Sequence, residues 1–141
     1  MKPVDTFNAY FAAFEKAYLD NAWERIAPYF APDITYNTAG GDVAQGRAAA
    51  IDYLRNDVDS LDRRFDVREF VGEPDISGDG DQVTMVFTVR YRKAGLPDLE
   101  ISGKEVATIR DGQILQLDDL FDEAAMAGFA TWMDQHGAQL A

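Results

Sequence analysis

Residues 98–121, DLEISGKEVATIRDGQILQLDDLF, place two carboxylates where a strand pattern calls for apolar side chains. Two runs of alternating residues flank the turn-forming Arg110-Asp111-Gly112, which predicts a β-hairpin. Alternate residues of a strand point to the same face. Glu105 therefore shares its face with the mainly apolar residues Ile101, Ala107 and Ile109. Asp119 shares its face with Leu115, Leu117 and Phe121.

The turn of this hairpin decides whether the two acids lie on the same side of the sheet. A two-residue turn at Asp111-Gly112 would place Glu105 opposite Asp118, whereas a three-residue turn would place it opposite Leu117. A slip of one residue sends every side chain to the other face, so the register that joins the two apolar faces should win. We therefore expect the three-residue turn, with Gly112 left-handed in a bulge. Asp119 then lies diagonal to Glu105 at about 7–8 Å, where both acids can touch one small ligand.

The composition excludes several classes of protein. The chain has 141 residues, enough for one domain with a sizeable core, and 47% of them are hydrophobic. Its formal net charge of −12 argues against nucleic acid or an anionic membrane surface as a partner. No apolar run has membrane-spanning length and the first residues lack the pattern of a signal peptide. The absence of cysteine excludes disulfides and thiolate chemistry and fits a cytoplasmic location.

Periodic patterns predict the order of the secondary structure. Apolar residues at helical spacing predict helices at 5–19, 22–30, 47–61 and 122–137, with Asp5 as the N-cap of the first. Alternating patterns predict strands at 34–37, 65–71 and 83–92, in addition to the two arms of the hairpin. The glycine-containing stretches 38–41 and 74–81 are expected to be loops. One α+β domain over residues 1–141 follows, with a curved antiparallel sheet that is covered on one face by amphipathic helices and encloses a pocket.

Three segments carry a resemblance to known proteins. They are the aromatic first helix with the following AWERIAPYFAPDITYN, the segment GRAAAIDYL, and the terminal IRDGQILQLDDLFD. In this order they resemble the nuclear transport factor 2-like superfamily, in particular its SnoaL-like and ketosteroid isomerase-like members. The resemblance covers almost the whole chain. It implies a cone-shaped α+β fold with a deep pocket, and a homodimer formed through the outer face of the sheet.

The resemblance also implies roles for the two acids. Asp119 stands where SnoaL-like cyclases and related epoxide hydrolases have a general acid or base. Glu105 stands where ketosteroid isomerases hold a protonated acid that donates to a developing oxyanion. However, Phe14 replaces the oxyanion-binding tyrosine of those isomerases, and Thr38 replaces their proton-shuttling aspartate. Isomerisation of ketosteroids is therefore not expected.

Four residues are expected to contact a ligand: Phe14, Tyr36, Tyr53 and Leu117. Tyr10 and Asn37 are further polar candidates, because a buried phenol or amide needs a hydrogen-bond partner. Packing in the core, with the polar tip at the surface, is the competing interpretation for these polar residues. No metal site is expected, because the acids near residue 119 follow no ligand spacing and have no histidine or cysteine beside them.

These observations lead to two hypotheses about function. The first is an enzyme that binds a small apolar molecule and acts on it as an isomerase, cyclase or hydrolase by proton transfer, without a cofactor. Asp119 would be its general acid or base and Glu105 would assist, because burial and like charge both raise the pKa of a carboxyl group. The alternative is a non-catalytic module for ligand binding or dimerisation. An acid with an abnormal pKa in the free protein would favour the enzyme.

Overall fold

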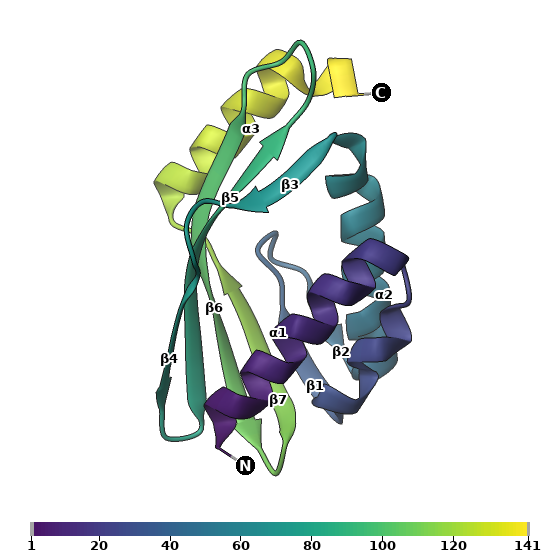
Figure 1. Cartoon of the computed structure of the whole chain (residues 1–141), viewed down its shortest axis with the longest axis vertical. Coiled ribbons are helices and arrows are strands. Elements are labelled where there is room, and N and C mark those ends of the chain that lie inside the picture. Colours follow the sequence, from purple (N-terminus) through teal and green to yellow (C-terminus); the bar gives the residue numbers. More distant parts are fainter. Residues whose placement is uncertain (1, 141) are drawn as a thin grey trace.

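A computed structural model of the chain describes residues 2–140 (Figure 1). The helices in this part are α1 (Pro3–Asp20), α2 (Arg47–Ser60) and α3 (Glu123–His136), with the short 3-10 helices η1 (Trp23–Tyr29), η2 (Asp62–Arg64) and η3 (Gly137–Leu140). The strands are β1 (Phe30–Asn37), β2 (Val43–Gln45), β3 (Val67–Phe70), β4 (Asp75–Asp79), β5 (Gln82–Arg92), β6 (Leu99–Arg110) and β7 (Gln113–Leu120).

The strands form one seven-stranded sheet in the order β2-β1-β7-β6-β5-β3, with β4 also paired to β5. Strands β4 and β3 share one edge of β5, because β4 pairs with its first half and β3 with its second half. All neighbours are antiparallel except β1 and β7, which are parallel. The α+β fold is therefore confirmed, but a purely antiparallel sheet was the wrong expectation. Strand β1, which follows η1, runs in the same direction as β7.

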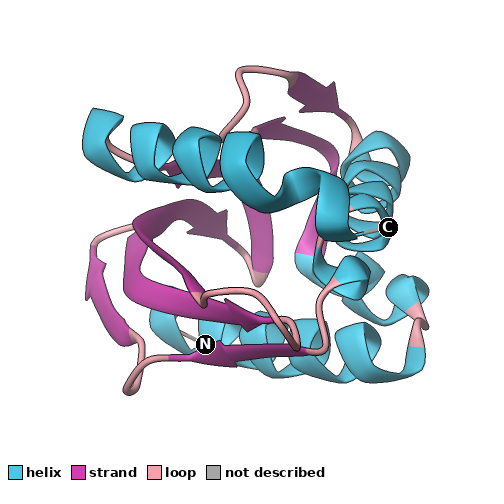
Figure 2. Ribbon diagram, turned by 90° about the horizontal axis from the view of Figure 1, so that it is seen from above, coloured by secondary structure: helices cyan, strands magenta, loops and turns pink. Residues whose placement is uncertain are grey.

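The helices contact one face of this sheet at its two ends. Helices α1 and α2 cover a first hydrophobic cluster that includes Val83 and Met85 of β5. Helix α3 covers a second cluster that includes Val89 and Tyr91 of the same strand. These four residues alternate along β5, so both clusters lie on one face of the sheet. Because the sheet is twisted, helices appear on several sides of the strands in the view from above (Figure 2). Phe87 packs against both clusters.

The turn between β6 and β7 differs from the expectation. Asp111 and Gly112 both have positive φ values, of 54° and 74°, as a two-residue turn between twisted strands requires. Leu115 then has no partner in β6, because Thr108 pairs with Gln116 and Ile109 pairs with Ile114. This β-bulge shifts the register by one residue, so Ile114 and Leu117 are both buried. Leu115 was wrongly expected to share the inner face.

Other local expectations also need correction. Helix α1 begins at Pro3 after the cap residue Lys2, whose backbone N–H donates to the carboxylate of Asp5 at 3.3 Å. Asp5 therefore lies in the first turn and is not the N-cap. The expected loop 74–81 contains strand β4, and its turn is confined to two residues between β4 and β5. Strand β2 was not predicted, since three residues are too few to show a period.

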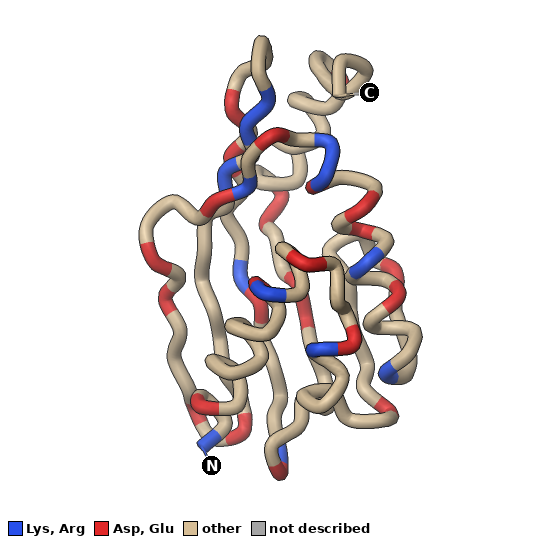
Figure 3. Tube along the Cα trace, turned by 45° about the vertical axis from the view of Figure 1, so that its right-hand side comes forward, with Lys and Arg blue, Asp and Glu red and all other residues tan. Residues whose placement is uncertain are grey.

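The end of the sheet near β3 carries interleaved acidic and basic residues (Figure 3). Arg90 and Arg92 both pair with Glu69 and Asp98, at 3.4–4.0 Å. These pairs are partly exposed, so each adds little to stability. None of the helices in residues 2–140 is both long and apolar enough to cross a membrane.

Candidate functional site

Glu105 of β6 lies directly opposite Asp119 of β7. The bulge at Leu115 produces this pairing, which brings the two side chains closer than the expected diagonal arrangement. The two carboxyl groups are joined by a hydrogen bond. Two acids in direct contact cannot both be ionised without a large repulsion, so the pair favours the state in which they share one proton.

The surroundings of the pair assign that proton to Glu105. Burial raises the pKa of Glu105 well above its usual range, and the negative charge of Asp119 raises it further. Burial also raises the pKa of Asp119, but hydrogen bonds from Glu105 and from the Tyr36 hydroxyl stabilise its anion and act in the opposite direction. Asp119 is therefore the carboxylate and Glu105 the acid.

Two tyrosines complete this end of the site. Tyr36 of β1 donates its hydroxyl hydrogen to Asp119, and its ring meets the ring of Tyr53 edge-on at 5.5 Å. Within residues 2–140 the hydroxyl of Tyr10 has no hydrogen-bond partner. No fully buried side-chain oxygen or nitrogen of these residues lacks a partner. The hydroxyl of Tyr10 therefore opens into the cavity that this residue lines, as a free donor near the acids.

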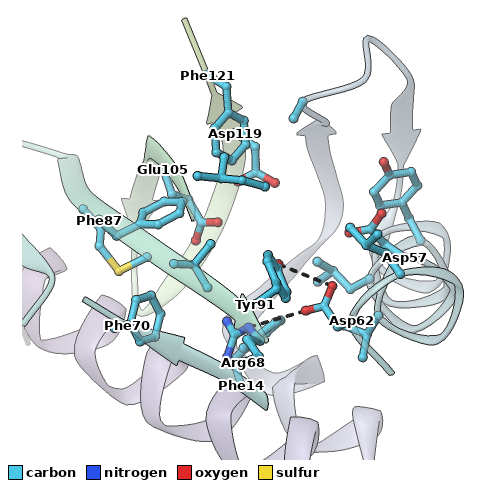
Figure 4. Close-up of a pocket in the computed structure, with 18 of the residues that line it drawn as sticks. Phe14, Asp57, Asp62, Arg68, Phe70, Phe87, Tyr91, Glu105, Asp119 and Phe121 are labelled. Atoms are coloured by element: carbon cyan, nitrogen blue, oxygen red, sulfur yellow. Dashed lines mark hydrogen bonds and ion pairs between the residues drawn. The ribbon is translucent and has the colours of Figure 1, made fainter. Parts of the chain in front are cut away.

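The carboxylate pair faces a cavity of about 330 Å³ between the two hydrophobic clusters. This volume lies at the lower end of the range for small-molecule pockets, about 300–1,000 Å³. Most of its wall is apolar and aromatic, with Phe14, Phe70, Phe87 and Phe121 around the open space (Figure 4). An apolar wall with a few polar groups is the usual character of a binding site for a small organic molecule.

A second polar group lies across the cavity from the acids and consists of Asp62, Arg68 and Tyr91 (Figure 4). Asp62 interacts with Arg68 Nε at 3.4 Å and lies 3.5 Å from the Tyr91 hydroxyl. Burial raises the pKa of Asp62 to about 7, although Arg68 acts against this rise. Burial likewise raises the pKa of Asp57, which lines the cavity nearby, and the charge of Asp119 adds to the effect.

The structure brings most of the expected site residues to this cavity. Glu105, Asp119, Phe14, Tyr36 and Tyr53 all line it. Leu117 does not, because its side chain is completely buried in the core.

Asn37 also lies away from the cavity, since its side chain donates to Asp118 at 2.6 Å. Sequence reasoning missed Asp62, Arg68 and Tyr91. The one available signal was the alternation in Val67–Phe70, which puts Arg68 on the same face as Phe70.

The chemistry available here is acid–base chemistry. The site offers an ionised carboxylate, a protonated carboxyl group and a free phenol within an apolar cavity. Within residues 2–140 no cluster of histidine, aspartate or glutamate side chains could hold a metal ion.

Comparison with solved structures identifies the fold. TerC, crystallised with polyporic acid, superimposes with a TM-score of 0.69 over 94% of this chain and 99% of that chain, at 19% identity. A provisionally named polyketide cyclase from Xanthomonas campestris pv. campestris gives 0.64 over 99% and 100%, at 16% identity. A protein of ketosteroid isomerase-like fold from Catenulispora acidiphila, in complex with trimethylamine, gives 0.61 over 82% and 87%, at 18% identity.

At such identities the structural neighbours establish the fold alone, which is the nuclear transport factor 2-like fold. A search among curated proteins found no match. The sequence profile of the SnoaL-like domain matches residues 7–117, which is most of the chain and includes most of α1, the core of the sheet and Glu105, and ends before Asp119. The chain belongs to the SnoaL-like domain family.

Proposed function

We propose that this protein catalyses the transfer of a proton on a small, mainly apolar molecule that carries a carbonyl or hydroxyl group, without a cofactor. The observation that carries the proposal is the pair Glu105 and Asp119, buried opposite each other at one end of an apolar cavity. Burial raises the pKa of both groups, which brings them closer to the working pH of a proton-transfer catalyst.

The residues take the following roles. Asp119 removes a proton from the carbon next to the substrate carbonyl, and the electron pair of the broken C–H bond moves into an enolate. The oxygen of the enolate accepts hydrogen bonds from Glu105 and from the free hydroxyl of Tyr10. Asp119 then returns the proton to the product, at the same carbon or at another one. Tyr36 holds the carboxylate of Asp119 in place.

Deuterium exchange tests this proposal without knowledge of the natural substrate. Small ketones such as 1-tetralone and 1-indanone are incubated with the protein in D₂O, and mass spectrometry follows deuterium uptake next to the carbonyl. We expect the protein to accelerate uptake. Replacement Asp119→Asn removes the base and should reduce the acceleration by about 10²–10⁴-fold.

Asp118→Asn is the matched control. Asp118 precedes Asp119 in the same strand, but its side chain points away from the cavity, where it accepts from Asn37 and Gln116. This variant should exchange deuterium at close to the wild-type rate, because the charge of Asp118 is the smallest of the influences on the pKa of Asp119. Equal rates for Asp119→Asn and wild type would reject the assignment of the base. If no ketone exchanges faster with protein, the non-catalytic binding module is the better description.

The outer face of the sheet is the proposed surface of a homodimer. Val86, Lys104 and Leu120 form one row across β5, β6 and β7 on this face. Val86 is 50% exposed and Leu120 is 45% exposed, which is high for apolar side chains on a sheet. Sedimentation equilibrium of wild type and of Val86→Glu tests the proposal. A monomer at all concentrations of the wild type would refute it.

A further inference from the structure

We propose that Asp62, Arg68 and Tyr91 form a second polar subsite, which binds a neutral oxygen function at the end of the ligand that points away from Glu105 and Asp119. The ligand is then an elongated molecule with an apolar body and a hydroxyl or carbonyl group at each end. This inference rests on the proposed function, because it takes the cavity to be the place where the substrate binds.

Strand β5 runs from one polar group to the other. Its Met85 lies opposite Glu105, and its Tyr91 lies opposite Arg68. Six residues of strand separate these positions, which corresponds to about 20 Å between backbone positions before the side chains reach inward. Two apolar residues of the same face lie between them and line the cavity: Phe87 and Val89. The wall along β5 is therefore apolar from Met85 to Val89 and lies between Glu105 of β6 at one end and Arg68 of β3 at the other.

Arg68 is fixed in position and still has a donor to offer. Its Nη1 donates to Glu15 at 3.2 Å, and its Nε lies 3.4 Å from Asp62. The guanidinium also stacks on Tyr18 at 4.7 Å and on Phe70 at 5.2 Å. Its Nη2 has no hydrogen-bond partner in residues 2–140, where no fully buried polar side-chain atom lacks one. This nitrogen is therefore reachable from open space, and the cavity is the open space that Arg68 lines.

The charges of this subsite favour a neutral oxygen over an ion. A carboxylate on the ligand would face Glu15, which already balances the charge of Arg68, and would also face Asp62 whenever that group is ionised. An ammonium group would face the guanidinium of Arg68 itself. A hydroxyl or carbonyl oxygen meets neither repulsion and can accept from Arg68 Nη2. Burial also raises the pKa of Asp62 to about 7, so near neutral pH this carboxyl group can act as a donor or as an acceptor.

Pairs of synthetic probes test the second subsite. Each pair has one apolar body with a hydroxyl at one end or at both ends: 2-naphthol with 2,6-dihydroxynaphthalene, and 4-hydroxybiphenyl with 4,4′-dihydroxybiphenyl. Isothermal titration at pH 6 measures the dissociation constants. We expect the second hydroxyl to tighten binding by about fivefold or more in at least one pair, as one additional buried hydrogen bond would.

Two variants assign that gain to the subsite. Arg68→Met removes the free donor and should reduce the advantage of the two-ended probe to less than about twofold. Asp62→Ala removes the carboxyl group and should reduce the advantage in the same direction. Arg63→Met is the matched control, because Arg63 also stacks on Tyr18, at 5.3 Å, but does not line the cavity. The advantage is the ratio of the dissociation constants of two probes on the same protein, so a general loss of stability does not change it.

The outcomes separate this inference from the proposed function. Equal affinity for both probes of each pair, or an advantage that survives in Arg68→Met and Asp62→Ala, overturns the inference. Tighter binding of 6-amino-2-naphthol or 6-hydroxy-2-naphthoate than of the diol overturns the preference for neutral oxygen. Failure of every probe to bind also overturns it. Deuterium exchange with Asp119→Asn decides the proposed function independently of these affinities.

Discussion

Asp62 should make the protein less stable as the pH rises, and replacement Asp62→Asn should remove this effect. Two influences compete at this side chain, which is only 8% exposed. The charge of Arg68 favours the ionised form, whereas burial opposes it and has the larger effect. The pKa rises from 3.8 to about 7. Each pKa unit corresponds to about 1.4 kcal/mol, so ionisation costs the folded state about 4 kcal/mol at high pH.

The sign follows from proton binding by the folded and unfolded states. Below pH 3.8 both states hold the proton and nothing is lost. As the pH rises toward 7, the unfolded state ionises first, so the free energy of unfolding falls until the folded carboxyl has also ionised. Part of this loss has occurred by pH 5, which leaves about 2–3 kcal/mol between pH 5 and pH 9.

Urea unfolding of wild type and of Asp62→Asn at pH 5 and pH 9 measures this difference. We expect the free energy of unfolding of the variant, relative to that of the wild type, to be about 2–3 kcal/mol higher at pH 9 than at pH 5. The measurement at pH 5 is the internal control for any effect of the amide itself. A difference that does not change with pH would refute the reasoning. An increase in the stability of the wild type relative to the variant as the pH rises would also refute it, because the ion pair with Arg68 would then outweigh burial.

Three further predictions concern the cavity and α3. In Tyr36→Phe, Asp119 loses a hydrogen bond that stabilises its anion, so the acidic limb of the pH profile for deuterium exchange should move to higher pH; an unmoved limb would contradict the role of Tyr36. In Gly103→Ala, the new Cβ would lie 2.4 Å from the ring of Phe121, so urea unfolding should show a loss of about 1–3 kcal/mol, and wild-type stability would contradict the close packing. Asp122→Ala removes the N-cap of α3 and should cost about 0.5–2 kcal/mol in the same assay.

The sequence was sufficient to predict which residues of β6 point to the inner face, because the alternation in this strand runs without interruption. Ala107 and Ile109 are buried, and Glu105 lines the cavity, as the period of two predicts. In β7 the same reasoning placed Asp119 correctly but Leu115 incorrectly. Joining the two apolar faces was the right criterion, yet the chain satisfies it with a short turn and a bulge rather than with a longer turn. Nothing in the residues around Leu115 distinguishes the two solutions.

The far end of the site was beyond sequence reasoning for a different reason. Asp62 follows α2, Arg68 belongs to β3, and Tyr91 belongs to β5. Only the packing of these three elements brings the side chains together, and no local period reports that packing. Arg68 on the inner face of β3 was the one visible anomaly. An isolated charge in a strand of four residues does not by itself indicate a site.

The bulge at Leu115 decides which of two consecutive aspartates lies beside Glu105. If Leu115 instead paired with Thr108 and no bulge formed, the two-residue turn would bring Asp118 opposite Glu105 and turn Asp119 outward. Consecutive aspartates therefore keep a carboxylate beside Glu105 in either register. The residues around that carboxylate differ between the two registers, because Leu117 and Phe121 would leave the inner face together with Asp119. A chain of the same length that paired without the bulge would keep a carboxylate beside Glu105 but would need new apolar residues at this part of the cavity wall.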